Sequence, residues 1–135
     1  MPLVRVLSRD EAERTRPVRL GVVISIRAPG MEPPELSSGW KSVLSLEIED
    51  VDLHGKLELG ADIDAPAAAI AAFVRVHRSA PQILIHCHAG VNRSRSVAAA
   101  LCETFGWPYR WTVLHKPLYD AVLAHLREST NACSS

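Results

Sequence analysis

The chain has 135 residues, of which 47% are hydrophobic and 22% charged, a balance typical of one folded domain and not of a disordered segment. Its formal net charge is zero, so no overall field attracts nucleic acid or an anionic membrane surface, and we expect neither as a partner. We find no apolar stretch long enough to span a bilayer and no secretion signal in the charged first 19 residues. The three cysteines lack the spacing of a disulfide framework, which favours a reducing compartment, so we expect a cytoplasmic protein. We also expect a monomer.

The first predicted elements are two strands. Residues 20–26 form a short apolar run rich in β-branched side chains. Residues 28–34 are rich in proline and glycine and predict a loop. Residues 42–49 alternate apolar and polar side chains, the pattern of a strand with one buried face.

The middle of the chain predicts a helix followed by a buried strand. The carboxylate of Asp64 is expected to cap the helix, with Pro66 in its first turn. Apolar residues then recur at helical spacing and leave Arg75 and Arg78 toward solvent. Residues 83–85 are a continuous apolar triplet, which is typical of a strand buried on both faces.

Two further helices complete the predicted fold. One covers residues 94–105, carries Cys102 in its apolar stripe and ends at Gly106, and the other covers residues 117–128. Strands that alternate with helices predict an α/β fold with a central, mostly parallel sheet flanked by helices. We expect one domain over residues 1–135, with a core at about 18–126. Ligands of such sheets bind at the carboxyl ends of strands, which singles out the segment from 83 to 94.

The loop after the buried strand combines residues suited to phosphate chemistry. Cys87 becomes a nucleophile as a thiolate, which a helix N-terminus and a neighbouring cation stabilise. Backbone N–H groups of residues 88–93 can form a nest for phosphate oxygens, and Gly90 allows the positive φ or close approach that such a loop needs. Arg93 offers a planar fork for two phosphate oxygens, and Ser94 can donate a hydrogen bond to the sulfur.

These residues reproduce a family signature. His86-Cys87, Gly90 and Arg93-Ser94 match the pattern His-Cys-x-x-Gly-x-x-Arg-Ser/Thr of the cysteine-based protein tyrosine and dual-specificity phosphatases, and the chain resembles their compact, bacterial-type members. The resemblance implies a dual-specificity phosphatase-like fold with the P-loop between a buried strand and a helix. It also implies hydrolysis of phosphotyrosine, and of phosphoserine and phosphothreonine as possible further substrates, through a phosphocysteine intermediate. The substrate would be a phosphorylated protein or a small phosphomonoester, and no cofactor or metal is expected.

The resemblance also assigns roles to residues. Cys87 and Arg93 would be catalytic, while His86 and Ser94 would support the loop. The family uses an aspartate upstream of the cysteine as general acid, and residues 46–50 match its pattern, which predicts Asp50 with Asp52 as the alternative. The phosphate would be bound by His88, Ala89, Gly90, Val91, Asn92 and Arg93.

Other interpretations stay open at this point. The run Gly90-Val91-Asn92-Arg93 is also similar to the loop of cysteine-dependent RNA 5′-triphosphatases, and a catalytically silent relative would only bind phosphate. Cys87 alone is compatible with a buried structural thiol. His86 and His88 bracket Cys87 and suggest a zinc site, but neighbours on an extended chain point to opposite faces. Asp50 and Asp52 are also compatible with ordinary turn residues.

Overall fold

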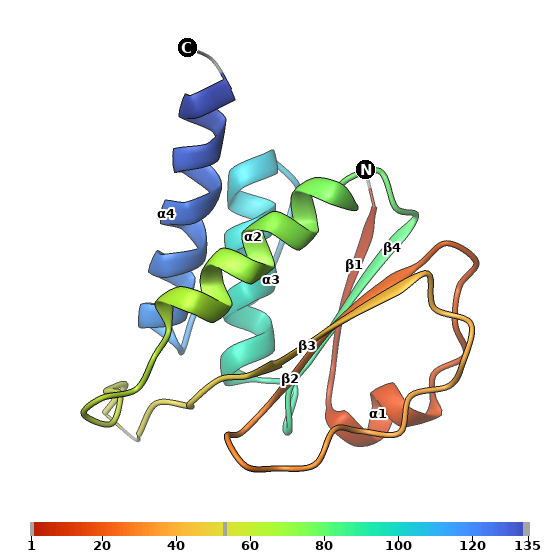
Figure 1. Cartoon of the computed structure of the whole chain (residues 1–135), viewed down its shortest axis with the longest axis horizontal. Helices are drawn as coiled ribbons and strands as arrows, with labels where there is room; N and C mark the ends of the chain where they lie inside the picture. Colours follow the sequence, from red (N-terminus) through yellow and green to blue (C-terminus); the bar gives the residue numbers. More distant parts are fainter. Residues whose placement is uncertain (1, 53, 134–135) are drawn as a thin grey trace.

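The computed structural model describes residues 2–52 and 54–133, which form a wholly parallel sheet with helices on both of its faces (Figure 1). The four strands lie in the order β1-β4-β2-β3. The strands are β1 (Leu3–Leu7), β2 (Val22–Arg27), β3 (Ser42–Glu47) and β4 (Gln82–His86). The helices are α1 (Arg9–Arg14), α2 (Asp64–Val76), α3 (Asn92–Phe105) and α4 (Lys116–Cys133). This architecture confirms the predicted α/β fold with a central sheet flanked by helices.

The sheet has a thick layer on one face and a thin one on the other. Helices α2, α3 and α4 pack on one face, where Ile24 and Ile85 of the central strands meet Leu101 and Leu118 of the helices. Helix α1 and the segment before β3 cover the other face, around Val23 and Leu84. Successive strand residues therefore point to opposite faces and are buried on both, as the apolar triplet 83–85 predicts.

Strand β3 confirms the prediction of a half-buried strand. It lies at the edge of the sheet, and its residues alternate between partly buried and exposed. The last helix also packs as predicted, with Leu118, Val122, Leu123 and Leu126 buried. No helix in the described part of the chain is both long and apolar enough to cross a membrane.

Strand β1 and helix α1 are additions that the sequence analysis did not predict. Strand β1 forms the other edge of the sheet and pairs in parallel with β4, from Leu3 opposite Gln82 to Leu7 opposite His86. Helix α1 follows directly and is closed by a capping box, in which the Ser8 side chain accepts from the Glu11 N–H and the Glu11 carboxylate accepts from the Ser8 N–H. The sheet therefore extends beyond the core predicted over residues 18–126.

The start of α2 differs from its prediction. Ile63 occupies the N-cap, Asp64 is the first helical residue, and Asp64 does not cap the helix. Asp62 supplies a carboxylate instead, because its Oδ1 accepts a hydrogen bond from the Ala65 N–H at 3.3 Å. The Asp64 carboxylate lies 2.8 Å from His125 Nε2, so it ties α2 to α4.

Candidate active site

Residues 87–93, called the phosphate loop after their expected ligand, lead from β4 into α3 at the carboxyl ends of the strands (Figure 1). Gly90 has φ +74°, and a Cβ there would lie 2.7 Å from Ser8 N and 2.8 Å from Leu7 C. The Arg9 N–H also donates to the His88 carbonyl at 3.0 Å. The loop thus packs directly against the junction of β1 and α1, and both reasons for glycine at position 90 apply at once.

The thiol of Cys87 is buried, and its surroundings lower its pKa. The residue is 2% exposed, and its Sγ lies 3.1 Å from Ser94 Oγ. Burial is the largest single influence on the thiol and raises its pKa. Hydrogen bonds from the Ser94 side chain and from the backbone N–H groups of Ser94, Val91 and Gly90 outweigh burial and leave the pKa of Cys87 below its ordinary value. The nest of N–H groups is therefore directed at the sulfur.

His86 lies beneath the loop as a fully buried neutral ring. Its Nδ1–H donates to the Cys87 carbonyl at 3.3 Å, since a carbonyl only accepts, and its Nε2 then accepts from Ser25 Oγ at 2.6 Å. Burial is the main cause that lowers the pKa of His86. His88 is exposed, so the two histidines do not converge. Within residues 2–52 and 54–133, no three His, Cys, Asp or Glu side chains group as metal ligands.

Arg93 holds its buried guanidinium against the segment that follows β3. The residue is 6% exposed, and its Nη1–H donates to the Ile48 carbonyl at the end of β3, at 3.1 Å. Its Nε lies 4.0 Å from Asp50 Oδ2 and has no hydrogen-bond partner among the described residues. A buried cationic N–H without an acceptor is costly, and an anion in the loop would satisfy it.

Residues 48–52 are called the acid segment after the general acid expected there. They bring the Asp50 side chain, and not that of Asp52, to Asn92 of the phosphate loop. Both carboxylate oxygens of Asp50 lie 3.3 Å from Asn92 Nδ2, and the side chain is 38% exposed. Asp52 instead accepts from the backbone N–H groups of His54 at 2.8 Å and Lys56 at 3.0 Å, and so stabilises its own turn. The geometry favours Asp50 over the alternative.

His115 is a structural residue of the site that the sequence analysis missed. It is fully buried, its Nε2–H donates to the Glu49 carbonyl at 2.8 Å, and its Nδ1 accepts from the Leu118 N–H at 3.2 Å. Its backbone N–H donates to Ser96 Oγ at 3.0 Å. His115 thereby joins the acid segment to α3 and α4. A single histidine between two helices has no spacing relative to the signature, so the sequence carries no signal for this role.

Two clefts are lined by residues of the acid segment. One, of about 590 Å³, is lined by Val51, Asp52, Gly55, Asn92 and Leu114. A second, of about 360 Å³, carries more carboxylates than cations, and its polar lining residues are Glu49, Asp50, Asp52, Lys56 and Glu58. The surface beside the acid segment is therefore rich in carboxylates, and neither Cys87 nor Arg93 is among the residues that line these two clefts.

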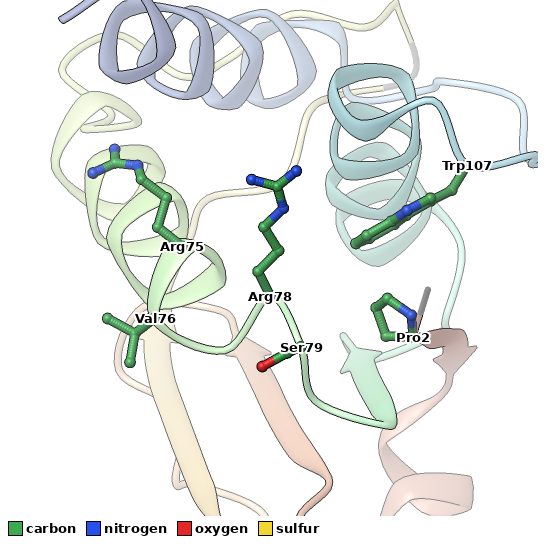
Figure 2. A pocket seen from close by; sticks show the side chains of 6 residues that line it. All are labelled: Pro2, Arg75, Val76, Arg78, Ser79 and Trp107. Carbon is green, nitrogen blue, oxygen red and sulfur yellow. The ribbon is translucent and has the colours of Figure 1, made fainter. Parts of the chain in front are cut away.

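A third cleft, of about 560 Å³, is lined among others by Pro2, before β1, and Ser79, before β4 (Figure 2). It therefore lies at the opposite end of these two parallel strands from Cys87, which follows β4. Arg75 and Arg78 line it from the end of α2 and the turn that follows, and Trp107 and Pro2 form another part of its wall. The Arg78 guanidinium lies 4.8 Å from the centre of the Phe105 ring, which accounts for its placement. No residue of the signature lines this cleft.

Cys102 is separate from the site, as its place on an apolar helix stripe predicts. It is 2% exposed on α3, and burial raises its pKa to about 11. Such a thiol is unreactive at neutral pH. The side chain of Cys133 lies outside the described residues.

Comparison with known proteins gives a limited result. No family model and no curated protein matches the sequence. Among solved structures, the chain is similar to the human tyrosine phosphatase-like serine/threonine/tyrosine-interacting protein, with a TM-score of 0.46 and 18% identity over 86% of this chain and 80% of that chain. A likeness of this extent carries no information about activity, so the functional argument depends on the site itself.

Proposed function

We propose that the chain hydrolyses phosphate monoesters through Cys87, with phosphotyrosine as the main substrate class and phosphoserine and phosphothreonine as further ones. One observation carries the proposal: a buried thiol whose pKa is lowered by three backbone N–H groups and Ser94, in a loop whose Arg93 has a buried guanidinium with no hydrogen-bond partner for Nε among the described residues. A purely structural thiol buried in apolar surroundings has the opposite shift, as Cys102 illustrates.

In the first step the Cys87 thiolate attacks phosphorus. The S–P bond forms while the bond from phosphorus to the ester oxygen breaks. The N–H groups of the phosphate loop and the Arg93 guanidinium stabilise the negative charge on the equatorial oxygens. Asp50 gives its proton to the leaving oxygen, which departs as an alcohol or phenol.

In the second step water attacks the phosphocysteine. Asp50, now a carboxylate, takes a proton from the water as the new P–O bond forms and the S–P bond breaks. The sulfur leaves as a thiolate, and the hydrogen bond from Ser94 Oγ, at 3.1 Å, stabilises it. Inorganic phosphate is released and the enzyme returns to its starting protonation state.

The carboxylates beside the acid segment favour a substrate with a single phosphate over RNA 5′-triphosphate. A triphosphate-ended RNA is a polyanion, and Glu49, Asp50, Asp52 and Glu58 would repel it more strongly than they repel one phosphate group, with Lys56 as the one lysine among the residues that line the second cleft. A silent phosphate-binding module is disfavoured because Cys87 and Arg93 are both present. We therefore infer a phosphorylated protein or small phosphomonoester as partner, with the cytoplasm as the expected compartment.

The test is metal-independent turnover that requires the thiol. Purified protein is assayed with p-nitrophenyl phosphate from pH 5 to 8, with EDTA, beside Cys87→Ser. We expect turnover by the wild type and a loss of at least about 10⁴-fold in Cys87→Ser, with unchanged thermal unfolding. Full activity in Cys87→Ser would refute the proposal. Phosphate release from triphosphate-ended RNA, without turnover of the aryl phosphate, would favour the alternative.

A further inference from the structure

We propose that Asn92, a residue of the phosphate loop, is the positioning residue for the general acid Asp50. The inference depends on the proposed function and adds a role that the signature does not assign to this position. It divides the loop into a part that binds phosphate and a part that holds the acid.

The contact joins the two halves of the site directly. Asn92 Nδ2 donates to both oxygens of the Asp50 carboxylate, each at 3.3 Å. Asn92 is also the first residue of α3, and its carbonyl accepts from Ser96 Oγ at 2.6 Å. The amide group therefore extends from a fixed point of the phosphate loop toward the acid segment.

The other hydrogen bonds between the acid segment and the rest of the molecule act on its backbone. Arg93 Nη1 donates to the Ile48 carbonyl at 3.1 Å, and His115 Nε2 donates to the Glu49 carbonyl at 2.8 Å. These bonds hold the chain beside Asp50, while Arg93 Nε approaches the Asp50 carboxylate only as an ion pair at 4.0 Å. Besides the adjacent Val51 N–H, at 2.9 Å from Oδ1, the described hydrogen bonds to that carboxylate come from Asn92.

An amide suits a residue that alternates between two protonation states. Asn92 Nδ2 can donate to the Asp50 carboxylate, and it can equally donate to the carbonyl oxygen of the protonated acid while the acid O–H is directed to the leaving oxygen. A lysine or arginine at this position would favour the carboxylate alone and so oppose the first step. A serine side chain is shorter and would not reach as far. A neutral donor therefore matches the acid-then-base cycle of Asp50.

The test compares leaving groups, because a general acid matters most when the leaving oxygen is basic. We would measure kcat/KM of the wild type, Asn92→Ala, Asp50→Ala and the double variant with phenyl phosphate and with p-nitrophenyl phosphate. We expect Asn92→Ala to lower kcat/KM about tenfold for phenyl phosphate and about threefold or less for p-nitrophenyl phosphate, whose leaving group needs the proton less. In the Asp50→Ala background, removing Asn92 should change either rate by no more than about twofold.

Two further measurements separate positioning from a structural effect. Inhibition by inorganic phosphate should be unchanged in Asn92→Ala, since phosphate binding uses the N–H groups and Arg93. The thermal unfolding curve of Asn92→Ala should also shift little, since the backbone carbonyl of residue 92 still accepts from Ser96 Oγ.

Equal losses with both substrates, or a loss that persists in the Asp50→Ala background, would overturn the role of Asn92. Failure of the proposed function would look different. It would appear as a wild type without turnover, or as full turnover in Cys87→Ser.

Discussion

The phosphate loop and the acid segment meet at one site but are built in opposite ways. The loop places Cys87 and Arg93 in the interior, at 2% and 6% exposure, and rests on the backbone of the β1–α1 junction. The acid segment leaves Asp50 at 38% exposure, and side chains from α3 and the region before α4 hold it in place. In the proposed mechanism, the group that stabilises charge is thus preorganised and buried, whereas the group that exchanges a proton with water lies nearer the surface.

The largest expected effect concerns Arg93, the buried cation of the phosphate loop. Arg93→Lys keeps the positive charge but removes the planar fork and the bond to the Ile48 carbonyl. We expect kcat/KM for p-nitrophenyl phosphate to fall about 10³-fold. Arg95→Lys, on the same helix, is the matched control and should leave the rate nearly unchanged. Near wild-type activity in Arg93→Lys would mean that the loop needs only local positive charge, and a similar loss in both variants would indicate a general effect on α3.

The next effect distinguishes the two aspartates of the acid segment. Asp50→Ala should lower kcat about 10²-fold and remove the decline of activity at high pH, because the acid must be protonated. Asp52→Ala removes only the bonds to its own turn, so its rate should stay within about twofold. The reverse pattern in the pH profiles would assign the acid to Asp52.

A third prediction concerns the support beneath the loop. Gly90→Ala should cost about 3 kcal/mol in the free energy of unfolding, because it adds a clash with Ser8 N and Leu7 C to an unfavourable φ. Gly30→Ala has a similar φ of +82° but nothing within 4 Å of the added Cβ, so it should cost about 1 kcal/mol. Urea unfolding measures both, and equal costs would show that the close approach is relieved.

The smallest effect concerns the thiolate. Ser94→Ala removes a hydrogen bond that lowers the pKa of Cys87, so the pKa should rise and alkylation by iodoacetamide should need a higher pH. The thiolate also becomes a poorer leaving group, and we expect kcat to fall about tenfold. Subtracting the rate of Cys87→Ser isolates the reactive thiol, and Ser94→Thr should restore the profile. An unchanged alkylation profile in Ser94→Ala would assign the lowered pKa to the backbone nest alone.

The sequence predicted the elements that have strong periodicity. The alternation in residues 42–49 indicates a strand with one buried face, and the apolar triplet 83–85 indicates a strand buried on both faces. Strands β3 and β4 were therefore recognisable from the sequence. The residues of the phosphate loop were also recognisable, because Cys87, Gly90 and Arg93 lie close together in the chain. The structure directs the Gly90 N–H at the Cys87 thiol and holds Arg93 against the acid segment, while their catalytic roles stay predictions.

The parts that escaped prediction depend on distant contacts. Strand β1 is a short edge strand among charged residues, although the spacing of Ser8 and Glu11 was a capping-box signal for α1. The misassigned cap at Asp64 arose because Asp62 was also within reach of the first turn. His115 meets Glu49 only through the packing of α4, which no local pattern encodes.

The support of Gly90 by Leu7 and Ser8 also constrains the order of assembly. Strand β1 lies at the sheet edge with β4 as its neighbour, so the first strand of the chain pairs with the last. Closing so long a segment is entropically costly and slow, and it must occur before the backbone of residues 7 and 8 can shape the loop. We therefore expect refolding protein to regain most of its helix content before its activity, because the nucleophile's surroundings are completed by the contact that spans most of the chain.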